Sequence, residues 1–307
     1  MRNKFQYKFK KNILYLFLIF SSLIFANEES KLEMRELVKQ IRFQSQESIL
    51  ITQNGSNIFF NDGNIDQNFV RVVDGVSQES LFYGVGGVNE ETPLDEKNYL
   101  LKNLTQLRDS KKTVLSVNYA YNKKIRNKVL KELQKYRFTG ECVPSYEANK
   151  IYSSLKKTNK KDIENLSEVE NFLYLLNPEK FKNIKDYVRI LKNTDFDLLI
   201  IEPSLNGVFL TKEQIEELKI KKNGGKRLVV AYFSIGEAED YRFYWKKEWN
   251  LKKPEWIVKE NPNWKGNYII KYWNIEWKKI VSDYQRKLDE IGVDGYYLDT
   301  IDTFEQF

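Results

Sequence analysis

The sequence predicts an α/β fold, a (β/α)8 barrel of the TIM type, from three observations. Eight short apolar runs alternate with segments of helical periodicity, which is typical of a parallel sheet. Eight is also the number of strands that closes such a barrel. The last run, residues 295–302, ends in carboxylates, and the carboxyl ends of barrel strands are where active sites lie.

Each element follows from local composition. Runs that end in small or polar residues suit strands buried on both faces, and they predict strands at 49–54, 71–77, 113–120, 140–145, 172–177, 197–204, 227–234 and 295–302. Helical periodicity predicts helices at 32–43, 96–109, 123–136, 212–221 and 276–291. The stretch 152–171 is polar, carries both charges and lacks glycine and proline, so we expect a solvated helix or a linker there.

The N-terminus has the pattern of a secretory signal. Five Lys and Arg residues between positions 2 and 11 precede the uncharged run 13–25, which is followed by Ala26. We therefore predict a signal peptide at 1–26, and a secreted or extracytoplasmic protein in the periplasm or at the cell surface. The alternative is an uncleaved anchor, which would be the protein's link to a membrane, but the run is shorter than the roughly 18 residues of a span.

Composition narrows the chemistry. The formal charge of +7 falls to +2 without the signal, so no nucleic-acid partner is expected. Cys142 is the single cysteine and histidine is absent, which excludes an internal disulfide, Ser-His-Asp and Cys-His catalysis and His-ligated zinc. A metal-dependent deacetylase is disfavoured for the same reason. We expect no metal and no cofactor, and carboxylates as the acid–base groups.

Four motifs in the second half occur together in a specific order. They are AYFSIGEAEDYR at 231–242, WKGNY at 264–268, KYW at 271–273 and GVDGYYLDTID at 292–302. In this combination the chain resembles glycoside hydrolase family 114, the endo-α-1,4-polygalactosaminidase-like enzymes and their archaeal and bacterial relatives. The resemblance covers residues 198–304 and implies a barrel that hydrolyses polysaccharide.

The first half resembles the C-terminal half of the same family, through the motifs at 34–38, 53–55, 74–84 and 114–119. We therefore predict a circularly permuted barrel, with family strands 5–8 first and strands 1–4 after them. In this interpretation 27–307 is a single domain, made of the family's C-terminal half at 27–151, a linker at 152–171 and the family's N-terminal half at 172–307. The alternative is a gene-assembly artefact or a duplicated fragment; eight non-redundant strands favour the intact permutant. Glu202 and Asn118 stand where relatives carry Asp, a departure that bears on substrate specificity more than on fold.

Most glycosidases use two carboxylates that flank the scissile bond. By resemblance, Asp299 matches the first Asp of the family's Pro-Asp-Asn-x-Asp pattern and Glu79 the acid of the motif after the family's sixth strand. We predict that Asp299 is the nucleophile or base and Glu79 the general acid. Asp302, three residues further on, suits a hydroxyl contact or the tuning of its neighbour. The alternative for each acid is a structural one, as a cap or an ion pair at the start of a loop.

Further candidates for substrate binding surround the predicted strand ends. They are Tyr232, Ser234, Glu237, Glu239, Arg242, Asn54, Tyr83, Trp264 and Trp273. An ion pair between Glu239 and Arg242 is an equally good explanation of those two residues. All six tryptophans lie between positions 245 and 277, and most are expected to form the core of a long connection, with Trp264 and Trp273 chosen as stacking platforms. Carboxylates and aromatic rings would also suit the cationic group of an amino sugar.

These features lead to one functional hypothesis and one alternative. The first is a secreted glycoside hydrolase that cleaves an amino-sugar-containing, polygalactosamine-like polysaccharide with two carboxylates. The alternative is a non-catalytic carbohydrate-binding or cell-envelope interaction protein on the same scaffold. The sequence does not predict an oligomeric state.

Overall fold

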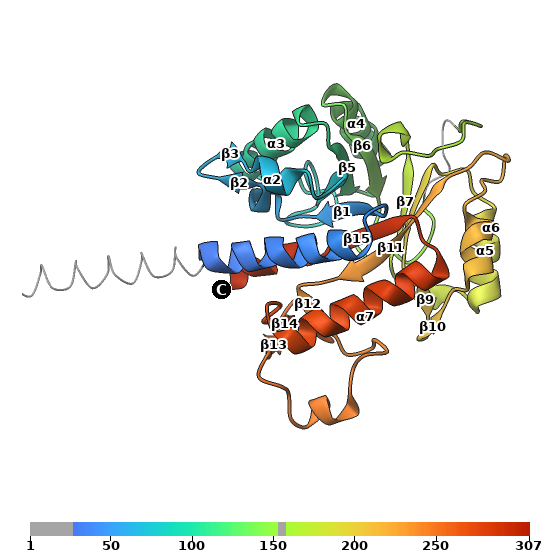
Figure 1. Cartoon of the computed structure of the whole chain (residues 1–307). Helices are drawn as coiled ribbons and strands as arrows, with labels where there is room; N and C mark the ends of the chain where they lie inside the picture. Colours follow the sequence, from blue (N-terminus) through green and yellow to red (C-terminus); the bar gives the residue numbers. More distant parts are fainter. Residues whose placement is uncertain (1–26, 153–157) are drawn as a thin grey trace, which may run out of the picture.

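Eight parallel strands form one sheet that curls into a nearly closed barrel (Figure 1). The structure is a computed structural model, and it describes residues 27–152 and 158–307. The strands are β1 (Ile49–Gln53), β4 (Gly75–Glu79), β5 (Thr113–Tyr119), β6 (Thr139–Val143), β7 (Phe172–Leu175), β8 (Leu198–Ile201), β11 (Leu228–Ser234) and β15 (Gly295–Asp299). Their order in the sheet is β6-β5-β4-β1-β15-β11-β8-β7, which confirms the predicted TIM-barrel type of fold.

The last strand of the chain lies between its first strand and β11. Gly295 pairs with Ile49, and Leu298 with Thr52, so Asp299 lies beside the end of β1. On its other side Asp299 is in register with Ser234. In any (β/α)8 barrel the last strand pairs with the first, whether or not the chain is permuted. This pairing therefore supports the barrel and does not test the permutation, which stays a prediction.

Helices cover the outside of the sheet (Figure 1). The first described helix covers 27–44, and it is followed by α2 (Gln67–Val70), α3 (Leu94–Asp109), α4 (Lys123–Lys135), α5 (Ile184–Lys192), α6 (Lys212–Leu218) and α7 (Ile275–Ile291). Asn122 caps α4, and Thr211 with Gln214 forms a capping box on α6. One buried apolar cluster lies largely between sheet and helices, and a second fills the barrel interior. Among the described residues, no helix combines the length and apolar character that a membrane span requires. The predicted signal at 1–26 lies outside the described residues.

Two of the differences between predicted and observed strand bounds concern predicted site residues. Residues 71–74 precede β4, and the strand itself is the polar run Gly75–Glu79, so Glu79 is the last residue of the strand. Ser77 and Glu79 occupy alternate positions of β4 and point into the barrel near the cavity. Because these inward side chains are polar, the strand was not recognised from a pattern of apolar residues. The last strand ends at Asp299, and Asp302 belongs to a following 3-10 helix, η5 (Ile301–Gln306). Helix α5 was not predicted, although Asn183 caps it and Ile184, Tyr187, Val188 and Leu191 have helical spacing.

The stretch 158–171 contains no α-helix and is not simply a solvated linker. Its one regular element is the 3-10 helix η2 (Leu166–Glu168), and Ile163, Leu166 and Val169 are buried with the apolar side chains of the barrel interior. The Thr139 hydroxyl at the start of β6 donates to the carbonyl of Val169, and the Ile163 amide donates to the carbonyl of Lys226, just before β11. The segment therefore closes the amino end of the barrel, opposite the carboxyl ends of the strands. Residues 153–157, within the predicted linker, lie outside the described residues.

The connection from β11 to α7 folds as a small unit with its own aromatic core. Its antiparallel sheet consists of β12 (Glu237–Glu239), β14 (Asn267–Ile270) and β13 (Ile257–Glu260). Tryptophan rings follow one another through this unit, with centroids 5.2 Å apart for Trp249 and Trp256 and 5.5 Å apart for Trp256 and Trp277. The predicted aromatic core of the long connection is thus present.

Candidate active site

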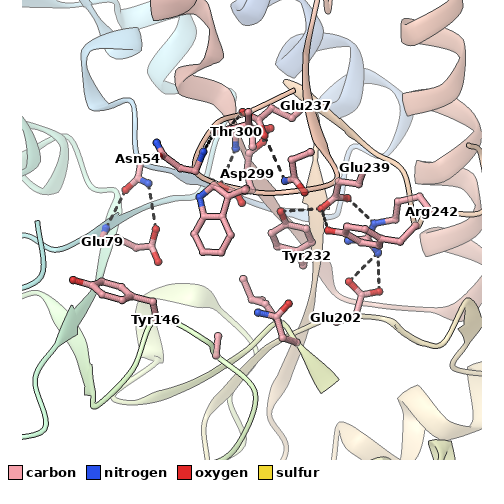
Figure 2. A pocket seen from close by; sticks show the side chains of 18 of the residues that line it. Asn54, Glu79, Tyr146, Glu202, Tyr232, Glu237, Glu239, Arg242, Asp299 and Thr300 are labelled. Carbon is pink, nitrogen blue, oxygen red and sulfur yellow. Dashed lines mark hydrogen bonds and ion pairs between the residues drawn. The ribbon is translucent and has the colours of Figure 1, made fainter. Parts of the chain in front are cut away.

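A cavity of about 690 Å³ opens at the carboxyl ends of the barrel strands (Figure 2). Strand ends, the loops that follow them and the β12–β14 unit line it. The predicted site residues that the structure brings together in this cavity are Asn54, Glu79, Tyr232, Glu237, Glu239, Arg242, Trp264, Asp299 and Asp302.

The other three predicted site residues are not in the described lining of the cavity. The Tyr83 hydroxyl accepts a hydrogen bond from Lys128 at 3.1 Å, on the outer side of the turn after β4. Ser234 donates to the backbone carbonyl of Glu237, so it supports a turn beneath the cavity. Trp273 packs against Phe307 with ring centroids 4.8 Å apart. Each lies near a strand end or a motif, but its side chain points elsewhere.

Glu79 ends β4 and accepts hydrogen bonds on both carboxylate oxygens. Oε1 accepts from the hydroxyls of Tyr119 and Tyr174, the latter at 3.3 Å. Oε2 accepts from Nδ2 of Asn54 at 3.4 Å, while Oδ1 of the same Asn54 accepts from the Glu79 amide at 3.0 Å. Three side chains from β5, β7 and the end of β1 thus fix this carboxylate, and Figure 2 shows its contacts with Asn54.

Asp299 ends β15, the neighbour of β1, and faces the same cavity. Its Oδ1 accepts the backbone N–H of Thr300 at 2.8 Å. Burial raises the pKa of Asp299 to about 8, and the negative charges of Glu79 and Asp302 act in the same direction. An aspartate that carries a proton near neutral pH beside a second carboxylate is the arrangement that acid–base chemistry requires.

Two further acids of the cavity are also shifted toward their neutral forms. Burial, together with the charges of Glu305 and Glu237, raises the pKa of Asp302 to about 7. Burial likewise raises the pKa of Glu237, against the hydrogen bonds from the side-chain amides of Asn261 at 2.8 Å and Asn267 at 3.4 Å. The β12–β14 unit therefore adds its own polar wall to the barrel strands.

Arg242 joins two buried glutamates at one side of the cavity (Figure 2). Its Nη1 lies 2.8 Å from both carboxylate oxygens of Glu202, and its Nε lies 2.6 Å from Oε2 of Glu239. Burial works against the charge of Arg242, but the two glutamates raise its pKa well above the ordinary value. The ion pair considered for Glu239 and Arg242 is therefore present, and Glu202, flagged only as a departure from the family pattern, is its third member.

Sequence reasoning missed several residues that line the cavity. Tyr119 and Tyr174 hold Glu79, Thr300 holds Asp299, and Tyr146 donates to the carbonyl of Gly84 at the rim. Tyr119 is the last residue of β5 and Thr300 directly follows β15, and both belong to the motifs given above. Their positions at strand ends could have indicated that they line the site. No such signal marked Tyr174, because an aromatic residue within an apolar run is expected to belong to the hydrophobic core.

The charge of the cavity is strongly one-sided. Among the lining residues that the structure describes, one carries positive charge, Arg242, and it is already shared by Glu202 and Glu239. The acidic lining residues are Glu79, Glu179, Glu202, Glu237, Glu239, Asp299, Asp302 and Glu305. No group of three or more acidic or cysteine side chains within 27–152 and 158–307 is arranged to hold a metal ion. The fold and site define a TIM-barrel-like α/β protein with an acidic cavity at the carboxyl ends of its strands.

Comparison with known proteins finds similarity over part of the chain. Residues 192–307 match the family model described as glycoside-hydrolase family GH114. Uncharacterized protein MJ1477 of Methanocaldococcus jannaschii is 42% identical over 147 residues, which are 48% of this chain and 42% of the relative. An uncharacterized protein of Thermotoga maritima is 44% identical over 115 residues, which are 38% of this chain and 35% of the relative. The chain thus spans less than half the length of these relatives.

One solved structure is also similar over part of the chain. It is the crystal structure of Aspergillus fumigatus Ega3 in complex with galactosamine, 22% identical, with a TM-score of 0.29. The similarity covers 36% of this chain and 39% of that one.

Proposed function

We propose that this protein is a glycoside hydrolase in which Glu79 and Asp299 act as the two catalytic carboxylates. The observation that carries the proposal is their placement: they end the strands on either side of β1 and line one cavity. Active sites of this kind of barrel lie at that end of the strands. The family match over 192–307 includes Asp299 and supports the reaction type.

The reaction needs one protonated and one ionised carboxyl group. The acid gives its proton to the leaving oxygen as the glycosidic C–O bond breaks, and the other carboxylate attacks C1 or activates the water that does so. The sequence-based prediction is that Asp299 is the nucleophile or base and Glu79 the acid. The raised pKa of Asp299 favours the opposite assignment, but a cationic sugar beside Asp299 would stabilise its ionised form.

The pH dependence of kcat/KM distinguishes the two possible assignments of the acid and the nucleophile or base to Asp299 and Glu79. This quantity reports the free enzyme, in which Asp299 has a pKa of about 8. If Asp299 must be ionised, kcat/KM rises with pH up to about 8; if it must donate a proton, kcat/KM falls above about 8. Because the charge of Glu79 raises the pKa of Asp299, the Glu79→Gln variant should move this limb to lower pH.

We propose an amino-sugar polymer as the substrate. The cavity has eight acidic lining residues and one arginine that is already paired, so it is complementary to a polycation. Trp264 adds an aromatic face that is 56% exposed and lines the same cavity, suited to the apolar face of a sugar ring and to an ammonium group. The family resemblance points to the same class, α-1,4-linked polygalactosamine.

We further propose that the protein is exported through residues 1–26, and that its barrel is a circular permutant of the family order. The Ser30 hydroxyl donates to the carbonyl of Phe304 at 2.9 Å, so the ends of the two halves lie side by side (Figure 1). Between β6 and β7, where the permutation would have joined the former termini, the described residues form no strand ladder. A relinked chain with 158–307 placed before 27–152 should therefore fold to the same barrel, and failure of this chain to fold would count against the permutation.

The test of the main proposal is release of reducing ends from α-1,4-polygalactosamine by the mature chain. Glu79→Gln and Asp299→Asn should each lower kcat by about 10²–10⁴-fold, because each removes one partner of proton transfer or attack. Glu47→Gln, at an exposed position outside the cavity lining, is the matched control and should leave turnover unchanged. Full turnover by both cavity variants would exclude this mechanism. Binding of the polymer without cleavage by the wild type would instead support the non-catalytic alternative.

A further inference from the structure

Three neighbouring strands of the barrel end in the same uncommon backbone conformation. Asn54, Ser80 and Thr300 directly follow β1, β4 and β15, with φ angles of 58°, 55° and 61°. L residues adopt this left-handed region at a cost, and for a β-branched residue such as Thr300 it is a genuine outlier. Strain of this type persists only where the surrounding structure enforces it, and it clusters at functional sites.

Two of these residues come immediately after the proposed catalytic carboxylates. The turn at Thr300 directs its own backbone N–H onto Oδ1 of Asp299 at 2.8 Å. The Ser80 amide donates to the carbonyl of Val117 at 2.7 Å as the last bond of the β4–β5 ladder, and the left-handed φ of Ser80 then turns the chain away from the sheet directly after Glu79. In both places a left-handed residue fixes the direction of the acid that precedes it.

The turn at Thr300 is enforced by the end of β11. The Thr300 hydroxyl donates to the carbonyl of Asp299 at 2.6 Å, accepts from the amide of Gly236 at 2.8 Å and lies 3.0 Å from the hydroxyl of Ser234. A Cβ atom at Gly236 would lie 2.0 Å from the carbonyl oxygen of Thr300, so only glycine permits this approach. Ser234, predicted from sequence as a substrate contact, belongs to this support.

The turn at Ser80 is enforced in a similar way. The Thr92 hydroxyl donates to the carbonyl of Ser80 at 2.5 Å. Asn54, itself left-handed, holds the Glu79 amide with Oδ1 and the Glu79 carboxylate with Nδ2. The strained turns on the two strands therefore have independent sets of partners.

We propose that Thr300 and Ser80 are positioning residues whose strained turns hold Asp299 and Glu79 in reactive orientation. The inference rests on the proposed function in so far as those two acids are the catalytic pair. It goes beyond that function because it assigns a role to the backbone conformation of residues that are not expected to touch the reacting atoms.

The test replaces left-handed residues by glycine inside and outside the cavity. Lys111 and Arg137 are exposed, have φ angles of 66° and 57° and are not in the described cavity lining. Lys111→Gly and Arg137→Gly relieve strain alone, so they should keep or raise the melting temperature, by up to about 4 °C, with unchanged turnover of α-1,4-polygalactosamine.

Glycine at the two cavity positions should separate stability from activity. Thr300→Gly and Ser80→Gly should each lower kcat about tenfold or more with little change in KM, while the melting temperature stays within about 4 °C of the wild type. Thr300→Ser retains the hydroxyl that is held by Gly236 and should restore most of the activity. Unchanged kcat in both cavity variants would overturn the inference.

A second measurement is independent of turnover. Titration of Asp299 by NMR should give a higher pKa in Thr300→Gly than in the wild type, because the Thr300 N–H bond favours the ionised carboxylate. Lys111→Gly should leave this pKa unchanged. If the wild type cleaves no amino-sugar polymer, the proposed function fails, and the titration alone decides whether Thr300 positions Asp299. An identical Asp299 titration in Thr300→Gly and the wild type would then reject that role.

Discussion

Acidic side chains lie at both ends of the barrel, and the two ends differ in how many of these acids have a cationic partner. At the amino end, an aspartate precedes each of the strands β4, β8 and β15, and each one has a cationic partner. The pairs are Asp74 with Arg42 at 2.6 Å, Asp197 with Lys221 at 3.0 Å and Asp294 with Lys219 at 3.1 Å. At the carboxyl end, eight acids line one cavity with the single cation Arg242 among its described lining residues.

The difference shows what distinguishes a structural acid from a chemical one. Asp74 also accepts the amide of Leu50, and Asp294 accepts the amide of Val229, so these side chains close the first hydrogen bonds of the neighbouring strands. Within the described residues Glu79 and Asp299 form no ion pair, and the charge of Glu79 contributes to the raised pKa of Asp299. Ion-paired acids contribute to the fold at one end, whereas two neighbouring carboxyl groups, one of them neutral below about pH 8, suit the proposed acid–base role at the other.

The largest expected effect on stability comes from breaking a pair at the amino end. Lys221 and Asp197 are fully buried, and the Lys221 ammonium also donates to Asn159 and to the carbonyl of Lys161. Asp197→Ala leaves that ammonium without a counter-charge, so the free energy of unfolding should fall by about 3–5 kcal/mol. Chemical denaturation measures this change, and kcat per folded molecule should be unaffected.

The counterpart at the cavity end is Glu202→Gln. Arg242 keeps Glu239 as a partner in this variant, so the loss of unfolding free energy should be smaller than for Asp197→Ala. A larger loss for Glu202→Gln would mean that the cavity end also carries structural charge, and the contrast between the two ends would not hold.

A second effect, of comparable size, concerns the pH dependence of stability. The ordinary pKa of an aspartate is about 3.9, and that of Asp299 in the folded protein is about 8. Between these values the folded protein retains a proton that the unfolded chain has lost, so this acid makes stability fall as pH rises, and the loss is complete above about pH 8. Asp299→Asn removes this penalty, so relative to the wild type it should gain up to about 5 kcal/mol of unfolding free energy between pH 4 and pH 9.

Denaturation curves of the wild type and Asp299→Asn at several pH values provide the check. Asp197→Asn is the control at the other end of the barrel, and it should destabilise the protein because Lys221 loses its counter-charge. Equal stability of Asp299→Asn and the wild type across this pH range would show that Asp299 is not held in its neutral form.

Most of the fold was predictable because it follows from patterns that are local in sequence. The strands β5, β7 and β11 are continuous apolar runs, and their predicted starts agree with the structure to within one residue. β4 was misplaced because its inward side chains are Ser77 and Glu79, which belong to the cavity rather than to an apolar core. The strand that carries function is the one that departs from the apolar pattern.

Site residues that end a barrel strand could be predicted from the sequence, whereas those whose role depends on the direction of the side chain could not. Asp299 and Glu79 could be chosen because acids that end barrel strands meet at one face. Tyr174 was expected to be a core residue, but its hydroxyl donates to Glu79. Tyr83, which follows Glu79 in the same motif, was expected in the site, but its hydroxyl contacts Lys128. Which way such a ring turns is decided by packing between elements that are far apart in the chain.

The smallest expected effect is on substrate affinity. It should differ between Trp264 and Trp273, the two tryptophans that were predicted to stack on the substrate. Trp264 is 56% exposed and lines the cavity, whereas Trp273 packs against Tyr272 and Phe307. Trp264→Ala should raise KM about tenfold with kcat nearly unchanged, because a stacking face contributes to binding and not selectively to the transition state.

Trp273→Ala is the matched control, because it removes the same side chain from outside the cavity. It should lower the free energy of unfolding by about 1–3 kcal/mol through lost packing, with KM unchanged. Steady-state kinetics on α-1,4-polygalactosamine together with denaturation measure both quantities. If Trp273→Ala raised KM as much as Trp264→Ala, substrate recognition would extend beyond the acidic cavity, and the carboxyl end would have a second binding surface formed by the end of the chain.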